Sequence, residues 1–98
     1  PYYRLIKIII KSRDSNTLSI ASNWLFKSLS NGFIYPIYGP FDPHISKIKN
    51  QFIKQILIKY PNTNVRNKIK KHLMRSVESF ESIAKFRIVK LNVDIDPN

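Results

Sequence analysis

The segment QFIKQILIKY, residues 51–60, decides the fold because its apolar residues fit two kinds of element. Ile48, Phe52 and Ile56 recur every four residues, which is the spacing of one helix face. The aromatic and β-branched residues of the segment also fit a strand that is buried on both faces. The turn signal at Pro61 favours the strand, but the pattern alone leaves the helix open.

Two elements are predicted before this segment. Residues 3–12 are expected to form a strand, because isoleucines at alternate positions share one face. A helix is expected from about 17 to 30, after turn and N-cap residues at 14–16, because apolar residues recur there at helical spacing. Trp24 on that helix is predicted to pack in the core, and the alternative is a stacking platform for a nucleic-acid base.

A proline-rich stretch joins the helix to residues 51–60. Phe33–Tyr38 is predicted to be a short strand, and Pro36 places it at a sheet edge or at a bulge because proline has no N–H to donate. Residues 39–43, with the sequence GPFDP, are predicted to form a rigid loop. Tyr38 and Phe41 are candidates either for stacking on exposed bases or for packing.

A second helix and a last strand are predicted after this segment. The helix is expected from about 65 to 82, with residues 62–64 as its cap. Its apolar stripe consists of Val65, Ile69, Leu73, Val77 and Phe80. Residues 87–95 alternate between apolar and polar side chains, as a strand with one buried face does.

If residues 51–60 form a strand, the order of elements is βαββαβ. Two helices that cross to one face of a four-stranded sheet give an α/β fold of the α+β type, the ferredoxin-like sandwich. The 98 residues suffice for a single domain. Because the sequence opens on Pro1, residues 1–98 are expected to be one domain excised from a larger protein.

The charge distribution predicts an anionic partner. The formal net charge is +11, and no acidic residue occurs between Asp42 and Glu78. The nine cations of this interval are Lys47, Lys49, Lys54, Lys59, Arg66, Lys68, Lys70, Lys71 and Arg75. We expect them to form an outward surface for nucleic-acid phosphate or an acidic peptide, because like charges this dense repel one another. The alternative is an ordinary solvated face.

Catalytic chemistry is not indicated. The chain has no cysteine, which excludes disulfides and thiolate metal sites and favours a reducing, cytoplasmic compartment. With two glycines it cannot build a glycine-rich phosphate loop, nor the oxyanion loop of an acylphosphatase-like hydrolase. We therefore expect neither an enzyme nor a cofactor or metal site within this chain, and its apolar runs are too short to span a membrane.

Several stretches resemble the C-terminal domain of the primosomal replication-restart helicase PriA. They are PYYRL at 1–5, YGP at 38–40, QFIKQILIK at 51–59 and NVDIDP at 92–97. The order and spacing of these stretches match that family along the whole chain. The resemblance implies the fold of a small-subunit ribosomal protein with a ferredoxin-like sheet, which makes residues 51–60 a strand.

The resemblance also implies a function. The parent would be an ATP-dependent DNA helicase that recognises stalled forks, with its ATP, magnesium and zinc sites outside this chain. The domain would pack on the helicase core and hold single-stranded or forked DNA. Lys47, Lys49, Lys68, Lys71 and Arg75 are then the candidate phosphate contacts.

A second partner follows from the same resemblance, namely the acidic C-terminal tail of single-stranded DNA-binding protein. Family members bind this tail with an Arg and a Gln one helical turn apart, and the matching positions here are Arg66 and Lys70. Lysine at the glutamine position keeps a donor and adds a charge. The competing hypothesis is a free-standing ribosomal-type RNA-binding protein, which a short reading frame would favour.

Overall fold

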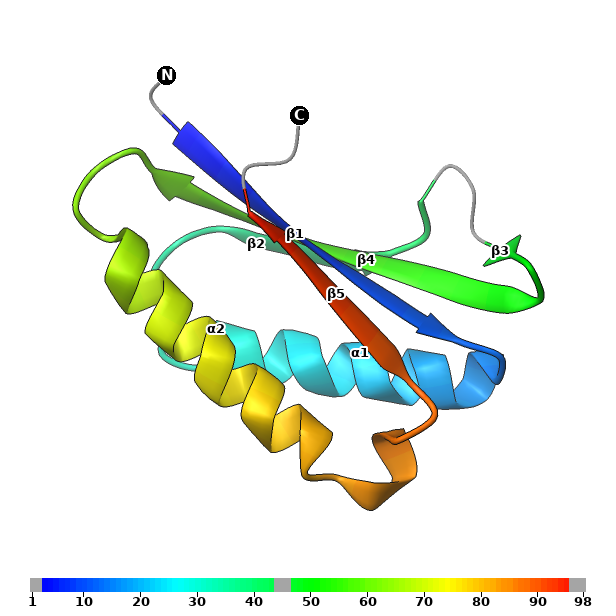
Figure 1. The fold of residues 1–98 in the computed structure, drawn as a ribbon. Coiled ribbons are helices and arrows are strands. Elements are labelled where there is room, and N and C mark those ends of the chain that lie inside the picture. Colours follow the sequence, from blue (N-terminus) through cyan, green and yellow to red (C-terminus); the bar gives the residue numbers. More distant parts are fainter. Residues whose placement is uncertain (1–2, 44–46, 96–98) are drawn as a thin grey trace.

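The computed structural model describes residues 3–43 and 47–95 and contains every predicted helix and strand (Figure 1). The elements in chain order are β1 (Tyr3–Ser12), α1 (Ser15–Ser30), β2 (Ile37–Phe41), β3 (Lys47–Ile48), β4 (Gln51–Pro61), α2 (Arg66–Glu81), the 3₁₀-helix η1 (Ala84–Phe86) and β5 (Lys90–Ile95). Residues 51–60 are therefore a strand, as the balance of the pattern and the resemblance predicted.

The sheet has the order β2-β4-β1-β5, and all neighbouring strands are antiparallel. Figure 1 shows both α-helices on one side of this sheet. Each helix connects two strands that are separated by a third, which is the split βαβ plan. The predicted ferredoxin-like α+β fold is confirmed, with one addition: the short strand β3 pairs with β4 as a hairpin arm.

The core lies between the sheet and the helices. Ile6, Ile8 and Ile10 of β1 are at most 1% exposed and meet Leu25 of α1 and Ile69 of α2 in one cluster. Alternation along the strand explains this burial, because every second side chain points to the helices.

Trp24 packs at one end of the core, where its ring meets Phe80 and Phe86 edge-on at 6.0 and 6.1 Å. Its predicted packing role is confirmed.

Asp14 begins α1 by accepting hydrogen bonds from the Asn16 backbone N–H (3.1 Å) and the Thr17 hydroxyl (2.7 Å). The Thr17 and Asn16 hydrogen bonds hold the pKa of the Asp14 carboxyl below its usual value, because they stabilise the charged form. The helix therefore starts at Ser15, two residues before the predicted start.

The predicted cap of α2 is wrong. The N-cap residue is Val65, in a helical conformation and without a side-chain hydrogen bond to the first turn. The side-chain oxygen of Asn62 instead accepts from Arg4 Nε on the neighbouring strand, at 2.7 Å. The Asn62 side chain therefore bonds to β1 and does not cap the helix.

The bounds of β2 also differ from the prediction. The strand starts at Ile37, so Phe33–Pro36 is a connection, and residues 39–41 of the predicted rigid loop belong to the strand. β2 is the edge strand and shifts register between Tyr38 and Phe41, as the edge-or-bulge prediction required. Gly39 sits in the shift with a φ of 118°, where an added Cβ would lie 2.7 Å from the Gln55 carbonyl oxygen.

The last strand is shorter than predicted. Residues 84–86 form η1, and β5 starts only at Lys90. Phe86 and Val89 precede it and are buried, which anchors the chain to the core before the strand begins. Within the described residues, no helix is both long and apolar enough to cross a membrane.

Candidate functional site

The nine cations of residues 47–75 divide among three elements. Lys47 and Lys49 belong to the β3 hairpin, Lys54 and Lys59 to β4, and Arg66, Lys68, Lys70, Lys71 and Arg75 to α2. β4 spans about 35 Å at roughly 3.3 Å per residue, and it separates the hairpin at its start from the α2 N-terminus beyond its end (Figure 1). The expectation of one continuous basic surface is therefore wrong.

Three of these cations have partners within the chain. Lys54 Nζ lies 3.0 Å from a carboxylate oxygen of Asp42. Lys59 Nζ lies 4.6 Å from the centre of the Tyr3 ring, and Lys47 Nζ lies 4.9 Å from that of Phe52. Lys54 is thus neutralised, whereas a cation over a ring keeps its charge for a further anion.

The hairpin presents Lys47 and Lys49 to solvent. Lys49 and Asn50 have φ values of 50° and 65°, the left-handed conformation of a two-residue hairpin turn. The turn places Lys49 at the tip and Lys47 on the arm that pairs with Phe52. The sequence signal that was missed is this asparagine, which tolerates positive φ.

The cations of α2 form two rows on opposite flanks of the helix. Residues advance by about 100° each, so Arg66 and Lys70 lie together on one side of the buried Ile69. Lys68 and Arg75 lie on the other side, which faces α1, and each lines a depression there together with His72. Lys71 points away from the sheet.

The α2 cations remain uncompensated: in the part of the chain that the structure describes, none of the five forms a salt bridge with a carboxylate. Glu78 and Glu81 lie in the second half of the helix. The unpaired N–H groups of the first turn add partial positive charge beside Arg66. The N-terminal half of α2 therefore attracts anions most strongly.

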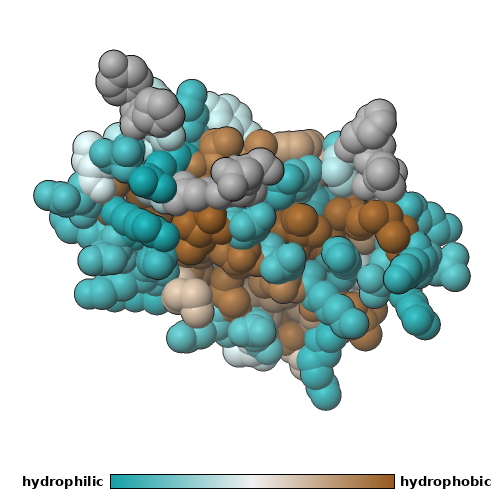
Figure 2. Space-filling view, turned by 45° about the horizontal axis from the view of Figure 1, so that its top comes forward, coloured by the Kyte–Doolittle hydropathy of each residue, from teal (hydrophilic) through white to brown (hydrophobic). Residues whose placement is uncertain are grey.

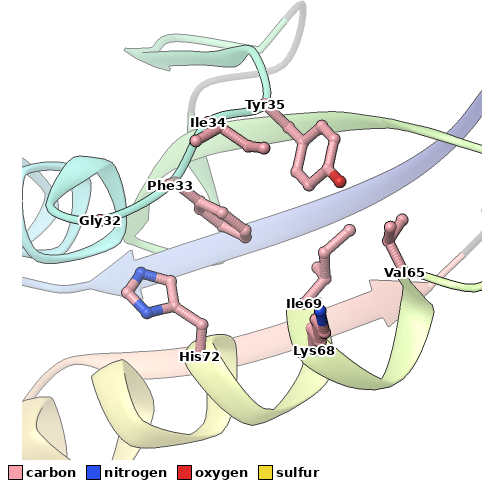
Figure 3. Close-up of a pocket in the computed structure, with 8 residues that line it drawn as sticks. All are labelled: Gly32, Phe33, Ile34, Tyr35, Val65, Lys68, Ile69 and His72. Carbon is pink, nitrogen blue, oxygen red and sulfur yellow. The ribbon is translucent and has the colours of Figure 1, made fainter.

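A pocket of about 270 Å³ lies beside this half of α2 (Figure 3). Its lining residues are Gly32, Phe33, Ile34 and Tyr35 from the α1–β2 connection and Val65, Lys68, Ile69 and His72 from α2. The lining is mostly apolar, with Lys68 as its cation. Sequence reasoning missed this pocket, because it assigned Phe33–Tyr38 to a strand.

His72 forms one wall of the pocket. Its Nε2 donates to the Leu29 carbonyl at 3.0 Å, and its ring meets the Phe33 ring at 4.6 Å. These contacts tie α2 to the end of α1 and to the connection that follows it, so His72 has a packing role. Arg66 and Lys70 do not line the pocket.

Comparisons with known proteins give a family and a fold. A de novo designed protein, Foldit4, superimposes with a TM-score of 0.62 at 6% identity, over 98% of both chains. A hydantoinase/carbamoylase family amidase from Burkholderia ambifaria gives 0.51 at 9% identity, over 96% of this chain and 27% of the amidase. At such identities these likenesses concern the fold alone. No curated protein sequence matches the chain.

The sequence model of the primosomal protein N C-terminal domain family matches residues 1–98, the whole chain. This match confirms the resemblance that the four sequence stretches indicated. The chain belongs to the primosomal protein N C-terminal domain family.

Proposed function

We propose that this chain is the non-catalytic C-terminal domain of a cytoplasmic replication-restart helicase, where it holds DNA and docks an acidic protein tail. The family supports a primosomal role in replication restart and favours the helicase hypothesis over a ribosomal-type RNA-binding protein. In this proposal the longer chain supplies the ATP, magnesium and zinc sites, and the domain supplies binding surfaces.

The observation that carries the proposal is the set of uncompensated cations on α2. Lys68, Lys71 and Arg75 are exposed on successive turns of α2, between its outer side and the side that faces α1, so a phosphate backbone that follows the helix meets them in sequence. Contacts of this kind hold nucleic acid without reading its bases. Lys47 and Lys49 lie too far from α2 to contact the same short DNA strand. They suit a second arm of a forked DNA.

The acidic tail is assigned to Arg66 and Lys70. The two side chains lie one turn apart on the flank of α2 opposite the α1 contact. A guanidinium can grip a carboxylate through two parallel hydrogen bonds, and an ammonium beside it adds charge without fixed geometry. The helix N-terminus strengthens the attraction.

Fluorescence anisotropy with labelled ligands tests this function. The chain should bind an oligo-dT strand and an acidic-tail peptide at low salt, and added salt should weaken both. A peptide of the same length with neutral amides in place of its carboxylates should not bind. Salt-independent binding, or none at low salt, would contradict the proposal.

A further inference from the structure

One side of the sheet carries no helix (Figure 1). Alternation along β1 sends Ile6, Ile8 and Ile10 to the helices and Leu5 and Lys7 to the opposite, open face. Figure 2 shows hydrophobic side chains gathered across the middle of the molecule on the sheet side, with hydrophilic ones around them. The face is therefore neither a second core nor an ordinary polar surface.

Strand pairing places six open-face residues next to one another. Tyr38 lies opposite Leu57, and Leu57 lies opposite Lys7, so these three form a row across β2, β4 and β1. Leu5 lies opposite Lys59 in the next row, and Tyr3 follows Leu5 on the same face. We call Tyr3, Leu5, Lys7, Tyr38, Leu57 and Lys59 the open-face patch.

The patch combines exposed rings with lysines. Tyr3 is 59% and Tyr38 is 49% exposed, so about half of each side chain meets solvent. Lys59 holds its Nζ over the Tyr3 ring. The leucines form an apolar floor, so a planar group laid on this face would meet rings, methyl groups and ammonium groups together.

The charge of the face indicates what covers it. Pairing places four lysines here, at positions 7, 11, 59 and 90, and among the described residues Asp94 is the one carboxylate that pairing adds. A second copy of this chain would bring the same excess of positive charge, and both copies carry +11. Lysine is depleted at the centres of protein interfaces. A single nucleic-acid strand complements both the charge and the rings, because its bases stack and its phosphates are anionic.

We propose that a base of a single strand stacks on Tyr38 of the open-face patch, while Lys7 and Lys59 contact the flanking phosphates. This inference rests on the proposed DNA-binding function and adds a second contact surface, on the side of the sheet opposite α2, where a base lies. It requires single-stranded nucleic acid, because the bases of an intact duplex have no free face to offer.

Tyr38→Trp places a fluorescent ring at the proposed stacking position, so quenching of its fluorescence reports stacking. Ile20→Trp is the matched control. Ile20 is 46% exposed on α1, which covers the other side of the sheet, and both variants keep Trp24 as a common background. Titration with oligo-dT at low salt should quench the added fluorescence of Tyr38→Trp and leave that of Ile20→Trp unchanged. Equal quenching, or no quenching in either variant while anisotropy shows binding, would overturn the inference and leave the proposed function standing.

A second measurement separates stacking from charge. Tyr38→Ala should weaken binding of oligo-dT about tenfold, which is within the usual range for one base–aromatic contact. It should not change binding of an abasic strand of equal length, which carries the same phosphates. An equal loss for both strands would overturn the inference, and so would self-association of the chain in sedimentation that Tyr38→Ala abolishes. No binding of either strand by the unaltered chain would remove the proposed function as well.

Discussion

The two faces of the sheet are built from the same strands and similar apolar residues, yet only one is closed. Ile8 on the helix side is fully buried, whereas Leu5 on the open side is 40% exposed. The buried isoleucines of the covered face belong to one apolar cluster with residues of both helices. The open face mixes leucine and tyrosine with lysine. Apolar residues in a strand therefore do not show by themselves which face holds the fold together.

The largest expected effect tests this difference directly. Ile8→Ala should cost about 2–5 kcal/mol of unfolding free energy, because it leaves a cavity in a packed core. Leu5→Ala should cost no more than about 1 kcal/mol, because much of that side chain already meets water. Urea denaturation of both variants measures the contrast. Similar losses for the two would show that the open face is also structural.

A second prediction separates the acidic peptide, which is proposed to bind α2, from the DNA strand, which is proposed to bind the open face. Arg66→Ala should weaken binding of the acidic-tail peptide by about 2 kcal/mol, roughly 30-fold, as the loss of a charged hot spot does. Arg87→Ala, an exposed arginine in the turn before β5, is the matched control and should have little effect. Tyr38→Ala should also leave peptide binding unchanged, because Tyr38 lies on the open face of the sheet and α2 covers the other face. An unchanged affinity for Arg66→Ala in isothermal titration would remove this residue from the peptide site.

A third prediction asks whether the helix side contributes to DNA binding. A plot of the logarithm of the oligo-dT binding constant against the logarithm of the salt concentration has a slope that counts phosphate contacts. Removal of charge at Lys68, Lys71 and Arg75 should lower the magnitude of this slope by about 2, because each contact on a single strand contributes roughly 0.7. A triple variant with neutral glutamine at these positions tests it by anisotropy at several salt concentrations.

Lys27→Gln removes an exposed cation of α1 outside the proposed contacts and should leave the slope unchanged. If the triple variant keeps the full slope, the phosphates follow the open face or the hairpin instead.

The smallest effect concerns the start of α1, which covers the sheet. The folded pKa of Asp14 lies below its usual value, so its contribution to stability is present above the unfolded pKa and disappears as pH falls through the folded pKa. Asp14→Ala should therefore melt at a lower temperature than the parent at neutral pH. The two should converge in acid, below both pKa values. A difference that persists there would assign the effect to something other than the carboxylate.

Much of the fold followed from local patterns. Alternating isoleucines marked β1, and the residue types of 51–60 favoured β4 once the turn at Pro61 was considered. The prediction of the bounds of β2 was wrong because residues 33–36 alternate like a strand but form a connection. The Pro36 carbonyl in this connection accepts a hydrogen bond from the Lys59 N–H at 3.1 Å. That contact joins residues far apart in sequence, so no local signal reports it.

The candidate site was harder to predict from the sequence than the fold was. A run of cations says how many charges are present but not where the chain carries them. The turn at Lys49 and the length of β4 move Lys47 away from α2, and the 100° step of the helix divides Arg66 from Lys68. The open-face patch depends on strand pairing between Tyr38, Leu57 and Lys7, which only the sheet register reveals.

Methyl NMR of the leucines compares the two faces within one sample. Leu5 and Leu57 lie on the open face, and Leu25 and Leu73 lie in the core on the other side. If single-stranded DNA stacks on the open face, saturating oligo-dT should shift the methyl signals of the first pair and leave those of the second in place. Unmoved Leu5 and Leu57 signals at saturation would contradict the account.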